Sequence, residues 1–306
     1  MDGKYRVRAH LSSGGMGDVY EAEHVYTHRQ VALKVMRHRT EGAEQLFVRE
    51  AEAVCAVDHP GVVEMLDAGR SPEGTWYAVF ELLEGLDLEA IFSGGGLGAQ
   101  ELSRVALDLL RALAATHAEG YVHRDVKPAN VFISFGPTGA GQVKLLDFGI
   151  AERMGPDGAP ALGHRVGTLE YMSPEQAQGH NVDGRTDVWS VGALLFRGLA
   201  GRSPIVARRS TEALRRLVFE DVPSVGDLRE GLPADLVAVV DRALARDPER
   251  RWASAADMAQ ALLCLDSEEL RTVEPPSPPP PTLPVRGPSQ RRFCIQSTVD
   301  LLPQAS

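Results

Sequence analysis

The pattern of apolar and polar residues divides this 306-residue chain into two differently built parts. Short apolar runs predict three strands within residues 5–37 and two more at about residues 62–69 and 76–81. Between the two groups of strands, residues 44–57 predict an amphipathic helix. The first part is therefore expected to be a small sheet that carries one helix.

Helical spacing dominates the second part of the chain. Apolar residues recur at this spacing between residues 101 and 117, which predicts a buried helix. They are Leu102, Val105, Ala106, Leu109, Leu110 and Leu113. Further helices are predicted near residues 211–220, 234–245 and 254–265, and only two short strands follow residue 130. The whole pattern predicts an α+β protein with a mainly helical second part.

Beyond Asp266 the composition changes. The sequence Glu-Pro-Pro-Ser-Pro-Pro-Pro-Pro-Thr-Leu-Pro lies within residues 273–288 and favours extended polyproline II over helix or sheet. We expect residues 267–306 to form a proline-rich linker or disordered tail; a docking peptide for a partner is the alternative. Residues 291–302 alternate in apolar character, which suits docking on the body or on a partner.

Composition excludes several classes of function. The formal net charge of -10 argues against binding to nucleic acid or to an anionic membrane. Cys55, Cys264 and Cys294 are scattered, without the spacing of a disulfide framework or a zinc site. No signal core is visible, and no apolar run approaches the roughly 18 residues of a membrane span. We expect a soluble protein of the cytoplasm.

Candidate chemistry is concentrated in residues 123–130, His-Arg-Asp-Val-Lys-Pro-Ala-Asn. Asp125 supplies a carboxylate, Lys127 an ammonium and Asn130 an amide, while Pro128 stiffens the loop. A second carboxylate, Asp147, follows a β-like run that would return it to the same place. An amide and an acid that converge suit Mg²⁺, which prefers oxygen ligands and bridges to substrate phosphates.

Two features of the first part could serve a phosphate-bearing ligand. Gly14, Gly15 and Gly17 would let backbone N–H groups approach phosphate oxygens, although such clusters more often mark ordinary hairpins. Lys34 lies in an apolar strand, where an ammonium is costly unless it is paired. A surface lysine that snorkels to solvent is the alternative.

In order and spacing, these motifs resemble those of protein kinases, and in particular the bacterial Ser/Thr kinases that look like their eukaryotic relatives. The resemblance spans roughly residues 5–265. It implies a bilobal protein-kinase fold, with an N-lobe at residues 1–83, a C-lobe at residues 84–266 and a hinge at about residues 81–85. It also implies transfer of the γ-phosphoryl group of ATP to Ser or Thr of protein substrates in signal transduction. The metal would be Mg²⁺, or alternatively Mn²⁺.

The resemblance further implies residue roles. Asp125 would orient the substrate hydroxyl and accept its proton, Lys127 would steady the γ-phosphate, and Thr168 would bridge the two. Lys34 would hold the α- and β-phosphates while paired with Glu50; Glu44 and Glu52 on the same helix are rival partners. Asn130 and Asp147 would hold the metal.

An adenine pocket follows from the same resemblance. Backbone groups of Glu81 and Leu83 would bond the adenine edge, Asp87 would reach the ribose, and Phe80 would be a large gatekeeper. The apolar walls would come from Leu11, Val19, Ala32 and Phe132. These apolar residues could equally be plain core.

Two contacts in the second lobe complete the picture that the resemblance implies. Glu175 would pair with Arg251, which ties the peptide-docking segment to the lobe. Asp187 would bond the backbone of the catalytic loop, with a helix N-cap as its alternative role.

Three departures from the family pattern qualify the expectations. Ser12 replaces the first loop glycine. Between Asp147 and Glu175 the only Ser or Thr residues are Thr168 and Ser173, so we expect activity without loop phosphorylation, with Asp157 neutralising Arg124. Ala129 and Arg197 stand where arginine-directed kinases carry acids, which predicts weak selection for arginine upstream of the target hydroxyl and some tolerance of acids.

Two rival functions remain. The first is a catalytically dead scaffold with the kinase fold, but Lys34, Asp125 and Asp147 are all present. The second is a kinase for small molecules, against which Lys127 and the docking segment at residues 167–175 argue.

Overall fold

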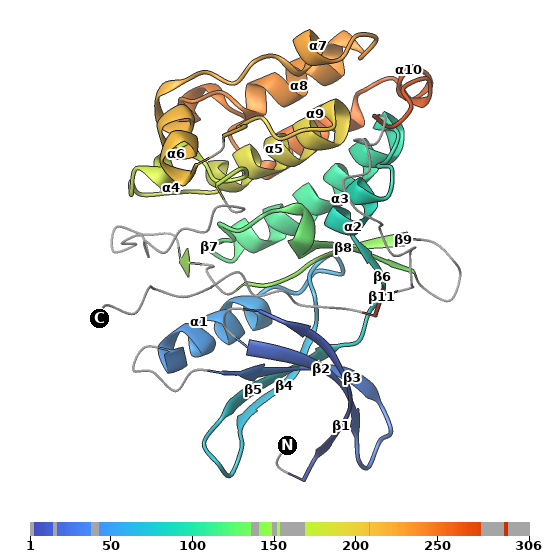
Figure 1. Cartoon of the computed structure of the whole chain (residues 1–306), viewed down its shortest axis with the longest axis vertical. Helices are drawn as coiled ribbons and strands as arrows, with labels where there is room; N and C mark the ends of the chain where they lie inside the picture. The colour runs from blue at the N-terminus through green and yellow to red at the C-terminus, as the bar shows by residue number, and fades with distance from the viewer. Residues whose placement is uncertain are drawn as a thin grey trace.

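The computed structural model describes residues 3–14, 17–37, 43–135, 141–148, 152–153, 169–207, 209–276 and 291–292. The N-terminal lobe is an antiparallel sheet of strands in the order β1-β2-β3-β5-β4. Its strands are β1 (Tyr5–Ser13), β2 (Gly17–His24), β3 (Gln30–Met36), β4 (Met65–Arg70) and β5 (Trp76–Glu81), and helix α1 (Ala43–Ala56) packs beside them (Figure 1). The predicted strands and helix are confirmed to within a few residues at their ends.

The period-two pattern of β3 places its side chains on two faces. Val31 and Leu33 join a small core with Tyr5, Tyr77 and Val79 on one face of the sheet. Ala32 belongs to the main core on the other face, which continues into the second lobe. Because side chains alternate along a strand, Lys34 follows Ala32 onto the face that meets the second lobe.

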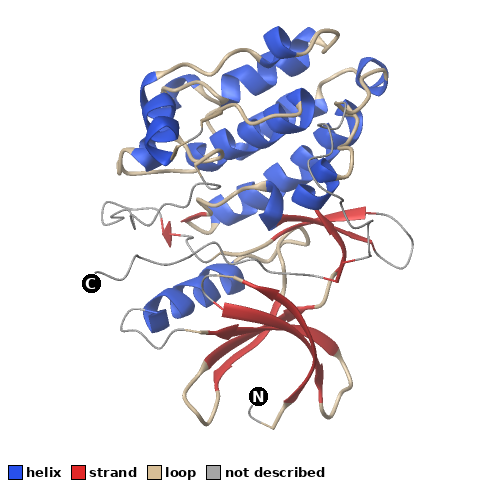
Figure 2. Cartoon of the chain, in the orientation of Figure 1, coloured by secondary structure: helices blue, strands red, loops and turns tan. Residues whose placement is uncertain are grey.

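The C-terminal lobe is mainly helical (Figure 2). Its longer helices are α3 (Ala99–Ala118), α5 (Arg185–Ala200), α6 (Ser210–Phe219), α8 (Ala234–Ala243) and α9 (Ala255–Leu263). Shorter ones are α2 (Leu88–Ser93), α4 (Pro174–Ala177), α7 (Val225–Leu228), α10 (Ser267–Arg271) and the 3-10 turns η1 (Pro128–Asn130) and η2 (Pro248–Arg250). All six predicted apolar positions of α3 are buried, which confirms that helix as a central support.

Short strands lie where the two lobes meet. Strands β6 (Glu84–Asp87), β8 (Val131–Phe135) and β9 (Gly141–Leu145) form a sheet with β11 (Arg291–Arg292), in the order β11-β6-β8-β9. Strands β7 (Tyr121–Val122) and β10 (Glu152–Arg153) pair separately. Residues 61–63 hydrogen-bond to Leu145 of β9, so segments of both lobes share one backbone network there. The α+β bilobal fold is therefore confirmed.

The structure differs from the sequence-based expectation mainly after Asp266. Residues 267–276 belong to the described body, because Leu270 and Val273 are buried in the main core and the carbonyl of Val273 accepts from the Ala99 N–H at 3.0 Å. The sequence alone did not predict this, because Leu270 and Val273 are only two apolar residues in ten, which is too few to predict a packed segment next to a proline-rich run. No helix in the described part of the chain combines enough length with enough apolar character to cross a membrane.

Candidate active site

The loop before η1 is held by a buried carboxylate on α5. Asp187 accepts hydrogen bonds from the backbone N–H of His123 at 2.9 Å, from that of Arg124 at 2.8 Å, and lies 2.8 Å from His117 Nε2. Burial alone would raise its pKa, but these hydrogen bonds hold the pKa of Asp187 below its usual value. Gly184 is the cap of α5, so the N-cap alternative for Asp187 is wrong.

His123 also ties the loop to β9. Its Nδ1 accepts from the Asp125 N–H at 3.3 Å, so its Nε2 carries the proton that is donated to the Leu146 carbonyl at 3.0 Å. The backbone of Arg124 is left-handed at φ 67°, and that of Asp147 at φ 57°. Left-handed non-glycine residues cost free energy and persist only where surrounding contacts impose them, as they do here.

Asp125, Lys127 and Asn130 converge at the end of this loop, and all three are buried. Asp125 Oδ2 accepts from Lys127 Nζ at 2.6 Å and from Asn130 Nδ2 at 3.0 Å. Asp125 Oδ1 is buried without a hydrogen-bond partner among the described residues. Burial raises the pKa of Asp125, and the ammonium of Lys127 offsets this only in part. One carboxylate oxygen is thus anchored, and the other is an acceptor still to be satisfied.

Lys34 is a member of a second buried cluster, at the boundary between the lobes. Its Nζ donates to Glu50 Oε1 at 2.5 Å and to Asp147 Oδ1 at 3.2 Å, and the side chain is only 1% exposed. Burial would lower the pKa of Lys34, but the two carboxylates hold it above the usual value. The snorkelling alternative is therefore wrong, and the rival partners Glu44 and Glu52 are exposed on other faces of α1.

This cluster holds two acids against one base. Burial raises the pKa of Glu50 and the neighbouring Asp147 carboxylate raises it further, whereas Lys34 opposes both effects. With all three groups ionised the cluster carries a charge of -1, which a bound cation would offset. Lys34 remains protonated because each carboxylate stabilises its charged form.

The two residues predicted to bind a metal, Asn130 and Asp147, are linked through the backbone. The N–H of Leu146, the residue before Asp147, donates to the Asn130 carbonyl at 2.9 Å. Asn130 Nδ2 points to Asp125, which leaves the amide oxygen to bind a cation. Among the described residues no three of His, Cys, Asp and Glu gather around one point. An amide oxygen and a carboxylate suit an ion such as Mg²⁺, which prefers oxygen ligands and keeps several waters in its shell.

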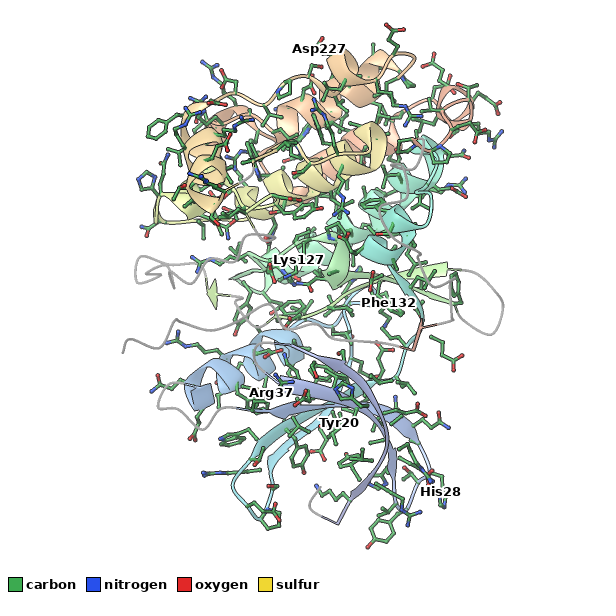
Figure 3. All side chains as sticks on the ribbon, in the orientation of Figure 1. Tyr20, His28, Arg37, Lys127, Phe132 and Asp227 are labelled. Carbon is green, nitrogen blue, oxygen red and sulfur yellow. The ribbon has the colours of Figure 1, made fainter. Side chains whose placement is uncertain are left out.

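The residues of the predicted adenine pocket are part of the main apolar core, which agrees equally with the plain-core interpretation. Val19, Ala32, Leu83 and Phe132 all belong to the main core, and Leu11 packs against it. In Figure 3, Phe132 lies between the sheet of the first lobe and the helices of the second, as does Lys127. Phe132 and the loop that carries Lys127 thus lie along the boundary between the lobes.

The hinge contains an ion pair that the sequence reasoning missed. Lys144 of β9 is buried, and its Nζ donates to Glu81 Oε1 at 2.6 Å and to the Val62 carbonyl at 3.4 Å. The same Glu81 oxygen accepts from the Glu64 N–H at 2.9 Å. Since β9 ends two residues before Asp147, this pair links the hinge to the strand that precedes the predicted metal-binding acid. A charged residue in the otherwise apolar Val143–Leu146 run was the available signal, as for Lys34.

Some predicted binding residues have structural roles in addition. Asp87 Oδ1 accepts from the Ala90 N–H at 2.7 Å and caps α2. A Cβ at Gly17 would lie 2.2 Å from the Val35 carbonyl oxygen, so packing against β3 already requires glycine there. The Gly14 N–H bonds the Gly17 carbonyl at 2.8 Å, which closes the turn. Gly15 and Thr168 lie outside the described residues.

A separate ion pair anchors the segment that begins α4. Arg251 donates to both oxygens of Glu175, at 2.7 and 2.8 Å, and stacks over Trp189 with 4.9 Å to the ring centroid. Thr186 adds a hydrogen bond to Glu175 at 2.8 Å. Burial would raise the pKa of Glu175, but Arg251 holds it below the usual value. The predicted Glu175–Arg251 pair is therefore confirmed.

Arg197 also forms an ion pair in the second lobe. Its guanidinium forms a two-pronged pair with Glu89 of α2, at 2.6 and 2.7 Å, and donates to the Tyr171 hydroxyl. The guanidinium lies 5.4 Å from the ring centroid of Phe92. This residue is thus a tie between α5, α2 and the segment around Tyr171.

Comparisons with known proteins agree with this geometry. The family model described as protein kinase domain matches residues 5–263. The chain is 36% identical over 285 residues to the serine/threonine-protein kinase PknB of Mycobacterium tuberculosis, covering 90% of this chain and 44% of that protein. It is 39% identical over 280 residues to the serine/threonine-protein kinase pkn2 of Myxococcus xanthus, covering 87% of this chain and 33% of that protein. The chain therefore spans less than half the length of these curated relatives.

Proposed function

The chain belongs to the protein kinase family, and we propose that it transfers the γ-phosphoryl group of ATP to Ser or Thr hydroxyls of protein substrates. One observation carries the proposal. Lys34 and Glu50 from the first lobe meet Asp147 from the second, and Asn130 donates to Asp125 and accepts from the N–H of Leu146, the residue before Asp147. Phosphoryl transfer depends on alignment and charge neutralisation, which such a connected set of groups supplies.

Asp125 would act on the attacking hydroxyl. Its Oδ2 is held by Lys127 and Asn130, which leaves Oδ1 to accept the hydroxyl proton. Its raised pKa makes the carboxylate a stronger base than an exposed aspartate. Lys127, within 2.6 Å of Asp125, would steady the transferred phosphoryl group.

The nucleotide would be held from both lobes. Lys34, positioned by Glu50, would bind the α- and β-phosphates, and Thr168 keeps its predicted role beside Asp125 and Lys127. Asn130 and Asp147 would hold Mg²⁺, or Mn²⁺ in its place, and the metal would neutralise charge on the phosphates. The excess of acids over bases in the Lys34 cluster supports this assignment.

The adenine would bind between the apolar walls and the hinge. Strand β5 ends at Glu81 and β6 begins at Glu84, which supports a hinge at about residues 81–85 between lobes at residues 1–83 and 84–266. Backbone groups of Glu81 and Leu83 would bond the adenine. Asp87 would contact the ribose only if its cap on α2 leaves an oxygen available.

The structure sharpens the expected substrate preference. Glu89 already neutralises Arg197, so this guanidinium would attract acidic substrates less than its charge alone suggests. We therefore expect weak selection for upstream arginine with little gain from acids. A peptide array in which upstream arginine strongly improved phosphorylation would contradict this expectation.

The remaining expectations concern the cell. We place the enzyme in the cytoplasm, acting in signal transduction without loop phosphorylation; Asp157, its proposed charge substitute, lies outside the described residues. The proline-rich tail could alternatively be a docking peptide for a partner protein in the cytoplasm.

An ATP-turnover assay with a generic protein acceptor tests the proposal. We expect transfer of label to Ser or Thr by the wild-type protein, and loss of transfer in Asp125→Asn and Asp147→Asn. Nucleotide binding without transfer in the wild type would favour the scaffold alternative. Transfer to a small molecule but to no protein would favour the other rival.

A further inference from the structure

The tail of the chain returns to the hinge. Strand β11 pairs antiparallel with β6, with Arg291 opposite Gly85 and Arg292 opposite Glu84. Figure 1 shows β11 beside β6, although more than 200 positions separate them along the chain. Strand β6 starts one residue after Leu83, so the tail lies next to the proposed adenine-binding backbone.

The outer edge of β6 is a suitable place for an added strand. Its inner edge pairs with β8, with Gly85 opposite Ser134 and Leu86 opposite Ile133. A Cβ at Gly85 would lie 2.0 Å from the Ile133 carbonyl oxygen, so β6 lies very close to β8. The side of β6 away from β8 is therefore the side on which backbone groups can accept a further strand.

The charges of the two strands are opposite. Strand β6 contains Glu84 and Asp87, whereas β11 is Arg-Arg within a chain of net charge -10. Arg292 occupies the register position opposite Glu84. Opposite charges at facing positions stabilise antiparallel pairs, and this selects a basic segment for the edge.

The intervening residues suit a tether. The described body ends at Pro276, which packs against Gly96 and Gly201. A Cβ added at these two glycines would lie 3.6 and 3.3 Å from side-chain atoms of Pro276. Residues 277–290 are rich in proline; proline-rich linkers favour extended polyproline II, in which 14 residues would span about 43 Å. A stiff tether loses less entropy on docking than a flexible one and keeps the local concentration of its end high.

We propose that residues 291–292 form a hinge strap, a basic tail segment that docks on the edge of β6 as an added strand. The strap holds the hinge against the sheet of the second lobe and so tightens nucleotide binding. The docking itself stands independently of catalysis, whereas its effect on the nucleotide rests on the proposed function.

Engineered cysteines test the docking. Facing residues in antiparallel strands have Cα atoms about 4.5–5.5 Å apart, a distance that suits a disulfide. The experiment uses the full chain in which Cys55, Cys264 and Cys294 are changed to Ser. Glu84→Cys and Arg292→Cys are introduced together, and the protein is treated with a mild oxidant. We expect intramolecular cross-linking about tenfold faster than for Glu84→Cys with Arg286→Cys, whose tail cysteine lies on the tether. Equal rates for the two pairs, or no cross-link, would overturn the strap.

Charge reversal tests the effect on the nucleotide. We expect Arg292→Glu to weaken ATP binding about three- to tenfold, the scale of one or two lost net hydrogen bonds. The matched Arg286→Glu change should alter the Kd less than twofold, and adding Glu84→Lys to Arg292→Glu should restore it. Equal ATP affinity in all variants would refute the tightening, even with the cross-link formed. Failure of the wild type to bind ATP would instead count against the proposed function, because the cross-link is read without nucleotide.

Discussion

Two ionic groups in this protein are both buried, but they differ in the number of acids that face each base. The Arg251–Glu175 pair matches one base with one acid and satisfies both carboxylate oxygens. The Lys34 cluster sets two acids against one base, and the pKa of Glu50 is raised while that of Glu175 is lowered. The first group stabilises the fold without a ligand, whereas the second holds a charge that a ligand cation would neutralise.

The difference separates a structural ion pair from the proposed nucleotide and metal site. A buried pair with complete hydrogen bonding is costly to break, because either partner alone would be an unpaired buried charge. A buried group that keeps an unsatisfied acceptor, such as Asp125 Oδ1, is instead ready for a substrate atom. Changes at the two places should therefore affect different measurements.

The largest expected effect is on catalysis. Asp125→Asn removes the proposed proton acceptor and should lower kcat about 10²- to 10⁴-fold, the usual contribution of a general base. Single-turnover phosphoryl transfer from ATP measures it, with urea unfolding as the control for folding. A kcat within threefold of the wild type would show that Asp125 is not the base.

The structural pair should affect stability by a similar free energy. Arg251→Ala leaves Glu175 as an unpaired buried carboxylate and should lower the free energy of unfolding by about 3–5 kcal/mol. The adjacent Arg250, 82% exposed in its side chain, is the matched control, and Arg250→Ala should change stability by less than about 1 kcal/mol. Equal losses of unfolding free energy in Arg251→Ala and Arg250→Ala would show that the buried pair has no special structural role.

Acid should weaken the same pair. The pKa of Glu175 lies below its ordinary 4.5, so the stability from its ionisation is present above about pH 4.5 and is lost as the pH falls through the lowered pKa. Glu175→Gln should therefore flatten the acid limb of a plot of unfolding free energy against pH. An unchanged limb would mean that other carboxylates control acid unfolding.

The ion pair at the hinge, Lys144 with Glu81, should have a smaller effect than the buried Arg251–Glu175 pair. Lys144 and Glu81 are balanced but less buried, with side chains 9% and 20% exposed. Lys144→Met and Glu81→Gln, combined in a double-mutant cycle on the KM for ATP, should show a coupling of about 1 kcal/mol. Lys144→Arg should recover most of the affinity. A coupling seen in stability but not in KM would assign the pair to folding alone.

The smallest effect should be a shift in pH dependence. The pKa of Asp125 is raised above its ordinary 3.8, so the acid limb of kcat/KM should lie above that value. Since Lys127 lowers this pKa, Lys127→Met should move the limb to still higher pH, whatever its effect on the maximal rate. A shift to lower pH would contradict the arrangement of charges around Asp125.

Much of the site could be predicted because its residues occur in short motifs. Asp125, Lys127 and Asn130 lie within six positions, and the pairing of Lys34 with Glu50 follows from the spacing of family motifs. The hinge pair of Lys144 and Glu81 was missed, since 63 positions separate the two and neither stands in a motif. The short helices α2, α4 and α7 were missed because four to six residues show too little of a helical period.

The sequence by itself determined the order of strands and helices, the family and the reactive residue types, because periodicity and motif spacing are local properties of a chain. Only the tertiary structure decided that Lys34 also meets Asp147, that Arg197 is neutralised by Glu89, and that the tail pairs with β6. These are contacts between distant segments, and they follow from which faces pack together and which charges must be paired when water is excluded.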